Sequence, residues 1–214
     1  MSLIIAGSLP PLEEAQYVTP PTQAPAQAPP QATMSAPVTA FTPLNLGRSV
    51  FEQIINALAD LARKDQRIGQ MFKGGQALEN GVIITTPEGV ITMIIVGNRP
   101  VIYYRLNYAN QLLNKLRDLY IQLRNKIASG LAREPDIALY YLLDLLYQNY
   151  TPLGEIVLSP ELMKTVSAVS AMLPHFEIGE AYAPYIVKIG TAFSRVLPIY
   201  EALLNLLYKN ARIY

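Results

Sequence analysis

The chain has 214 residues, and it contains no cysteine, no tryptophan and only one histidine. Without cysteine it can form neither disulfide bonds nor thiolate metal sites. A single histidine leaves few ways to assemble a histidine-activated nucleophile or a histidine metal centre. The sequence therefore predicts no cofactor and no metal site.

Charged side chains are also scarce. Asp, Glu, Lys and Arg make up 15% of the residues, against about 25% in an ordinary soluble protein, whereas hydrophobic residues make up 51%. A monomer of this size keeps its whole surface hydrated mainly with charged groups. The shortage therefore indicates that part of the surface is covered by partner subunits or by lipid. The alternative is a neutral monomer that is hydrated by Asn, Gln, Ser and Thr.

Long hydrophobic runs are missing as well. Residues 1–7, MSLIIAG, have no basic residue and too short an apolar run for a signal peptide. The longest apolar stretch, residues 90–96, is too short to span a bilayer. These absences predict an intracellular location, or a place inside a particle that is assembled in the cell. Contact between residues 90–96 and lipid stays open as an alternative.

Proline is concentrated at the front of the chain. Nine of the 17 prolines lie within residues 1–47, and residues 18–44, VTPPTQAPAQAPPQATMSAPVTAFTPL, contain no charged side chain. Proline fixes its own φ, lacks a backbone donor and pushes the preceding residue toward extended geometry. The sequence therefore predicts an extended, polyproline-like N-terminal arm over residues 1–47. A disordered linker, the usual fate of such a composition, is the alternative.

Two features of this arm favour docking over disorder. Disordered tails are usually charged, whereas this segment is not. It also carries apolar side chains at intervals, which suit an arm that lies across a neighbouring subunit. The residues predicted to make these subunit contacts are Leu9, Leu12, Tyr17, Val18, Val38 and Phe41.

Residues 48–214 are predicted to form a single domain. Ser49 and Glu52 have the spacing of a capping box, and the apolar residues that follow at helical spacing predict a helix. Three apolar runs come next, at residues 82–86, 90–96 and 101–106. Turn signals separate them, so they predict a three-stranded antiparallel β-meander at about 82–106. The middle run is apolar on both faces, and we expect helices to cover one face and a partner the other.

The rest of the domain is predicted to be helical. Residues 107–129 form an amphipathic pattern, and residues 134–148 are apolar nearly all round. Ser159 is a good cap for a third helix. A last helix from Pro184 should be kinked or split at Pro198. The predicted fold class is therefore α+β, predominantly α-helical.

The positive charge is concentrated in the middle of the chain. Residues 81–133 carry seven basic and two acidic side chains. The basic residues on or next to the helix predicted over 107–129 are Arg105, Lys115, Arg117, Arg124 and Lys126. Arg117 and Arg124 are seven residues apart and therefore share one side of that helix. Arg and Lys interleaved with amide side chains suit contact with a phosphate backbone. A solvated helix face and pairing with the acidic C-terminal half of a neighbouring subunit are the alternatives.

One cluster hints at metal or acid–base chemistry: His175, Glu177 and Glu180. Its spacing matches no metalloenzyme motif, and an ordinary loop between helices explains it better. The glycine-rich stretch 69–75 lacks the Gly-Lys-Ser/Thr ending of a phosphate loop. No nucleophile triad can be assembled either. The sequence therefore predicts that the protein is not an enzyme, with an enzyme centred on His175 as the last alternative.

These features together predict a structural assembly protein. An extended arm before a cysteine-free helical body resembles the layout of virion coat and nucleocapsid proteins, including those of viruses that infect archaea. The resemblance implies self-association through the arm, with copies of the same chain as partners, and contact with the genome through the helix over 107–129. The runner-up is a non-enzymatic DNA-binding accessory or regulatory protein that acts as a dimer.

Overall fold

The computed structural model describes residues 46–176 and 178–211, which lie in one compact unit of the chain, Thr42–Tyr214. Of the described residues 62% are helical, and they also form a five-stranded antiparallel sheet. The predicted mixture of helix and sheet, with helix predominant, is therefore confirmed. Residues 1–45 of the predicted arm, with all of its predicted subunit contacts, lie outside the described residues, and those contacts stay predictions.

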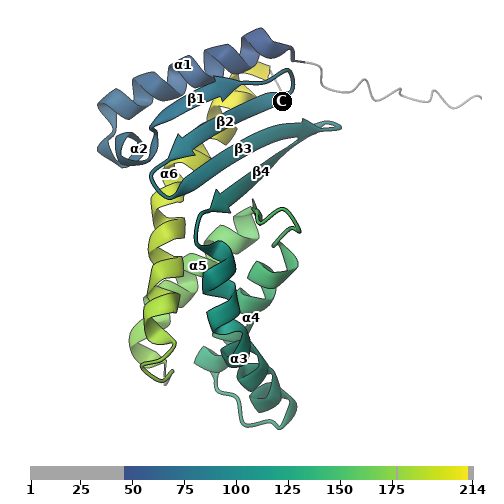
Figure 1. The fold of residues 1–214 in the computed structure, drawn as a ribbon, viewed down its shortest axis with the longest axis vertical. Helices are drawn as coiled ribbons and strands as arrows, with labels where there is room; N and C mark the ends of the chain where they lie inside the picture. The colour runs from purple at the N-terminus through teal and green to yellow at the C-terminus, as the bar shows by residue number, and fades with distance from the viewer. Residues whose placement is uncertain (1–45, 177, 212–214) are drawn as a thin grey trace, which may run out of the picture. The chain divides into compact units, whose positions relative to one another are not determined.

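Two helices precede the sheet, four strands follow in immediate succession, and a fifth strand lies between the later helices (Figure 1). In chain order the elements are α1 (Arg48–Lys64), α2 (Gln66–Met71), β1 (Gly74–Ala77), β2 (Gly81–Thr86), β3 (Gly89–Val96), β4 (Arg99–Leu106), α3 (Ala109–Ala128), α4 (Glu134–Gln148), β5 (Ile156–Leu158), α5 (Pro160–Met172), the 3₁₀ turn η1 (Leu173–His175) and α6 (Ala183–Ala211).

The strands pair in sequence order, β1-β2-β3-β4-β5, and every pair is antiparallel. The three predicted runs correspond to β2, β3 and β4. The prediction of only three strands is wrong, because β1 and β5 add one strand at each edge. β1 has the sequence GGQA, without a β-branched or aromatic residue, and β5 has only three residues. Neither carries a local strand signal, and each is held by pairing with a strand already in the sheet.

The two faces of the sheet differ in burial. On one face, Val82, Ile84, Ile91, Met93 and Tyr104 are fully buried. Figure 1 shows α6 passing behind the strands, and α1 packs against β1 and β2. The alternate residues point to the opposite face, where most side chains are partly or fully exposed. The prediction that helices cover one face is therefore confirmed, and no element of the described chain covers the other.

Helices α3 to α6 form a four-helix bundle. α3 packs against α4, α4 against α5, α5 against α6, and α6 returns to α3. The helices predicted over 107–129 and 134–148 are confirmed as α3 and α4, within two residues at each end. Ser159 caps α5 as predicted, because its Oγ accepts a hydrogen bond from the backbone N–H of Leu162 at 3.1 Å.

Helix α6 has 29 residues and is therefore ~43 Å long at 1.5 Å per residue. Its buried side chains recur every three or four residues. They include Ile186, Ile189, Phe193, Val196, Ile199, Leu203 and Leu207. Helix α6 runs through Pro198 without a break, so of the predicted kink or split the split does not occur, and the kink stays a prediction. Proline removes one backbone hydrogen bond, and the buried residues on both sides of it hold the helix together.

Helix α1 does not begin as predicted. It starts at Arg48, and its N-cap is Gly47, whose φ is 72°. Glycine reaches this left-handed region without strain, so the chain enters the helix before Ser49. No side chain caps α1, and Arg48 Nε instead donates to Glu52 Oε1 at 3.2 Å. The predicted capping box of Ser49 and Glu52 is therefore wrong.

Replacing Phe193 by alanine tests the place of α6 in the core. The Phe193 side chain is 2% exposed, and its loss leaves a cavity, so the free energy of unfolding should fall by ~3–5 kcal/mol. Val187→Ala, at a side chain of the same helix that is 50% exposed, should cost less than ~1 kcal/mol. Urea unfolding followed by circular dichroism measures both. Equal losses would contradict the packing of α6.

Candidate functional site

Helices α3 and α4 enclose a groove of about 580 Å³. The α3 residues that line it recur at spacings of three and four, so they share one side of the helix. The lining residues are Asn110, Leu113, Asn114, Arg117, Tyr120, Ile121, Arg124, Tyr147 and Tyr150. The prediction that Arg117 and Arg124 share a side is thereby confirmed. We call this surface the basic groove.

Three tyrosines join α3 to α4 beside the basic groove. The Tyr120 ring stacks on Tyr140 at a centroid distance of 5.2 Å and lies 5.0 Å from the Tyr147 ring. The Tyr120 hydroxyl donates to Asp144 Oδ1 at 2.7 Å, and the Tyr147 hydroxyl donates to the Leu113 carbonyl oxygen at 2.6 Å. The Tyr120 and Tyr147 rings are packed while their hydroxyls are hydrogen-bonded. The groove wall is therefore fixed by contacts between the two helices.

The positive charge of the basic groove comes from its two arginines. The hydrogen bond to Asp144 raises the pKa of Tyr120, and burial raises the pKa of Tyr147 to about 12. Both phenols are therefore neutral at physiological pH. Arg117 and Arg124 are exposed, and neither forms a salt bridge with another residue of the described chain. Their guanidinium groups are available to an anion from solvent.

The other basic residues predicted to contact nucleic acid lie outside this groove. Lys126 Nζ lies 3.4 Å from Asp136 Oδ1, in the first turn of α4. Arg105 is on β4, and its guanidinium lies 3.1 Å from Glu155 Oε1. Lys115 is exposed on α3 but is not among the groove residues. The structure therefore brings together only two of the five predicted basic residues.

Sequence patterns do not identify the groove tyrosines as part of a site. Tyr147 belongs to a helix that is apolar nearly all round, so its context indicates a core residue. Tyr120 falls next to the buried leucines of α3 and has the same context. The groove itself could have been inferred from the spacing of Asn110, Asn114 and Arg117. This spacing places the three polar side chains along one side of the helix.

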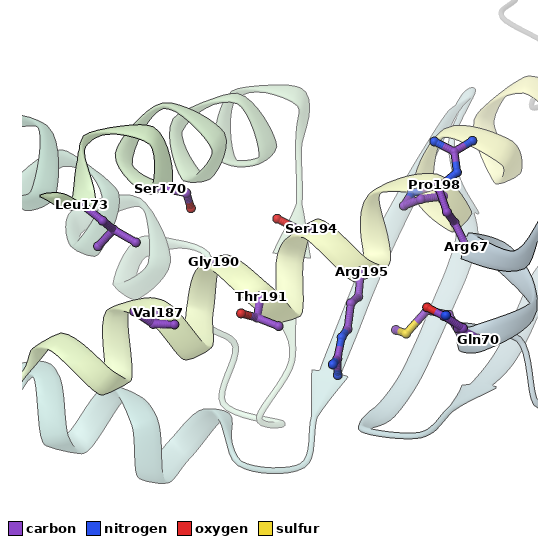
Figure 2. A pocket seen from close by; sticks show the side chains of 11 residues that line it. Arg67, Gln70, Ser170, Leu173, Val187, Gly190, Thr191, Ser194, Arg195 and Pro198 are labelled. Atoms are coloured by element: carbon purple, nitrogen blue, oxygen red, sulfur yellow. The ribbon is translucent and has the colours of Figure 1, made fainter.

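A second cavity, of about 420 Å³, lies between α2, α5 and α6 (Figure 2). Its polar lining residues are Arg67, Gln70, Ser170, Thr191, Ser194 and Arg195. Both arginines are already paired, since Arg67 Nη2 lies 2.8 Å from Asp65 Oδ2 and Arg195 Nη1 lies 3.2 Å from Glu88 Oε1. The cavity therefore offers hydroxyl and amide groups beside neutralised arginines, and it suits an anion less well than the basic groove does.

The residues of the predicted acid–base cluster lie at and after η1. His175 is the last residue of η1 and has an exposed side chain, and Glu180 is also exposed. Glu177 lies outside the described residues. Within residues 46–176 and 178–211, no group of three or more His, Cys, Asp or Glu side chains could hold a metal ion.

The face of the sheet opposite α6 is a further candidate surface. One row of side chains crosses four strands, because Ile83 lies opposite Thr92, Thr92 opposite Tyr103, and Tyr103 opposite Val157. All four side chains are partly exposed. We define the open sheet face as this row together with Val90, Ile94, Val96 and Val101.

Comparison with known proteins found no match to this chain among family models, curated proteins or solved structures. Among the helices that the structure describes, none has both the length and the apolar character needed to cross a membrane. The basic groove and the open sheet face are the two candidate functional surfaces of the described chain.

Replacing Tyr147 by phenylalanine should weaken the contact between α3 and α4. The variant loses the hydrogen bond to Leu113, and the free energy of unfolding at pH 7 should fall by about 1 kcal/mol. The pKa of Tyr147 in the folded protein, about 12, lies above the ordinary value of 10.0. Its stabilising contribution is therefore complete below pH 10 and is lost as the pH rises from 10 through 12.

Wild type should accordingly lose more stability than Tyr147→Phe across this pH window. Urea unfolding at pH 7 and at several values within the window measures both effects. Tyr208→Phe, at a side chain that is 43% exposed, is the control and should match wild type at pH 7. The same loss in wild type and Tyr147→Phe above pH 10 would contradict this role of the Tyr147 hydroxyl.

Proposed function

We propose that this protein is a structural subunit of the coat or nucleocapsid type, which assembles with copies of itself and has no catalytic role. The observation that carries the proposal is the open sheet face. Its apolar side chains lie outside the core cluster, and no helix or strand of the described chain covers them. A second molecule is the natural cover for such a surface.

The energetics of apolar surface support this proposal. Burial of apolar surface stabilises by about 25 cal/mol per Å², and exposed apolar patches larger than a few hundred Å² mark interaction sites. Val96 on the open sheet face is 55% exposed, and Leu131 and Leu153 elsewhere are 73% and 74% exposed. A charged fraction of 15% fits a subunit whose surface is partly covered in an assembly.

The N-terminal arm supplies a second means of association in this proposal. Residues 18–44 contain no charged side chain, so their burial between subunits requires no desolvation of a charge. Proline cannot donate to a strand ladder, but extended proline-rich segments do bind along apolar grooves. We therefore expect the arm to lie on a neighbouring subunit, with Val38 and Phe41 among its contacts.

The basic groove is the surface on which such a subunit would contact nucleic acid. Arginine donates bidentate hydrogen bonds to phosphate oxygens, and Arg117 and Arg124 have no salt-bridge partner in the described chain. Asn110 and Asn114 line the same groove and can add amide donors to the phosphate backbone. Because many subunits would repeat this contact along one nucleic acid, contacts that are weak individually would together give stable binding.

The same groove supports a second candidate function, that of a non-enzymatic DNA-binding accessory or regulatory protein acting as a dimer. Both candidates use the two groove arginines, so nucleic-acid binding alone does not distinguish them. The size of the assembly does, because a coat-type subunit forms large oligomers and a regulator forms a discrete dimer.

Size-exclusion chromatography with light scattering tests assembly, on the full chain and on a chain that begins at Leu46. The buried core runs from Phe51 to Leu207, so the shortened chain keeps it. We expect large oligomers from the full chain and smaller species from the shortened one, because the arm joins subunits. If both run as the same small species, the arm takes no part in assembly and the coat-type proposal is wrong.

Replacing Arg117 and Arg124 together by glutamine should weaken binding to duplex DNA. Each phosphate contact contributes about 0.9 to the slope of log K against log salt concentration, so the slope should fall by about 2 if each arginine makes one contact. Fluorescence anisotropy at several salt concentrations measures it. The control replaces Arg48 and Arg63 of α1 by glutamine, which changes the net charge equally. Equal effects of the two double variants would rule out a specific role for the groove.

A further inference from the structure

We propose that the open sheet face packs against the same face of a second copy of the chain, so that two sheets stack about a two-fold axis. This inference rests on the proposed self-association and assigns the body surface that mediates it. Sheets that pack face to face lie ~10 Å apart and interlock the side chains of their facing surfaces. A two-fold contact requires a surface that complements itself.

The open sheet face has the distribution of side chains that such a contact needs. Interface centres are depleted of charge, whereas interface rims are polar and stay accessible to water. Thr92 lies at the centre, between Ile83 and Tyr103 on the neighbouring strands, and the cross-strand row through it, from Ile83 to Val157, contains no charged side chain. The charged residues of β4 that point to this side are Arg99 and Arg105, which lie toward the two ends of that strand.

The charges at the rim do not oppose the pairing. Arg105 is already neutralised by Glu155, at 3.1 Å. Arg99 lies opposite Val96 next to the turn between β3 and β4, where a long side chain can keep its guanidinium in water. Stacking two copies therefore buries an uncharged centre and leaves these arginines at the edge.

The size of the face also fits a pair of chains. The strands that contribute to the face, β2 to β5, have six, eight, eight and three residues, at ~3.3 Å per residue and ~4.8 Å between strands. The flat outline is on the order of 400 Å² for one copy and 800 Å² for two. With the relief of the side chains added, the pair approaches the ~1,200 Å² at which stable, specific interfaces begin.

The edges of the sheet offer a second chain less contact than the face of the sheet does. β1 has four residues and β5 has three, so addition of a strand at either edge would form few hydrogen bonds. The face, in contrast, presents side chains of four strands, β2 to β5. The apolar area of the face can be buried only by a surface that packs against it, and a second sheet is the broadest such surface.

The first test compares two isoleucine-to-glutamate variants of the full chain. Ile94→Glu places a carboxylate within the proposed contact, next to Val101 on β4. Ile137→Glu is the control, because Ile137 is 51% exposed in the first turn of α4, where a carboxylate is tolerated. Sedimentation equilibrium should show association at least about 100-fold weaker for Ile94→Glu and unchanged for Ile137→Glu. Circular dichroism of both variants verifies that they are folded.

The second test uses the absence of native cysteine. Thr92→Cys places a single thiol at the centre of the face, and therefore near any two-fold axis through it. A bis-maleimide that spans ~10 Å, the distance between stacked sheets, should link it to the same residue of the second copy. Ser49→Cys, at an exposed position of α1, should give no comparable product.

The outcomes separate this inference from the proposed function. If wild type is monomeric at every concentration, self-association itself fails. If wild type assembles but Ile94→Glu assembles equally and the Thr92→Cys variant is not cross-linked, the subunits associate through another surface and the inference is overturned. A monomeric full chain whose thiol at position 92 resists maleimide would mean that residues 1–45 cover the face, which also overturns it.

Discussion

The buried stripe of α6 is the constraint on which the rest of the structure depends. This one helix packs against α5 and α3 in the bundle and against α1 and α2 beside the sheet, and Phe193, Val196 and Leu203 are almost completely buried along it. Because the same helix serves both layers, the sheet and the bundle cannot separate without exposing its core residues. The position of α6 also decides which face of the sheet is covered, and none of the helices among the described residues covers the opposite face.

A similar dependence links the basic groove to the packing of α3 on α4. The leucines of α3 face the core, so the polar side of the helix, with Arg117 and Arg124, is left along the groove. Tyr120 and Tyr147 then connect the two helices through ring contacts and hydroxyl hydrogen bonds. Charge and aromatic surface therefore meet in the groove as a consequence of helix packing, without any local motif in the sequence.

The parts of the fold that the sequence predicts are those with a local cause. The helix over 134–148 and the central strands follow from periodicity and turn signals, and the shared side of Arg117 and Arg124 follows from helical spacing. β1 could not be predicted, because the sequence GGQA becomes a strand only by pairing with β2. The partners of the other basic residues could not be predicted either, since Arg105 meets Glu155 fifty residues away and this contact depends on the fold of β5 onto β4.

The structure shows on which surfaces the chain has few charged side chains. The centre of the open sheet face, around Thr92, and residues 18–44 both lack charged side chains, and both are proposed to meet other copies of the chain. The open sheet face and the basic groove share no residue. A pair of chains stacked through their sheets would therefore keep two basic grooves accessible. Two grooves held in one particle bind a continuous phosphate backbone more tightly than either does alone, so the proposed pairing would strengthen the proposed nucleic-acid contact.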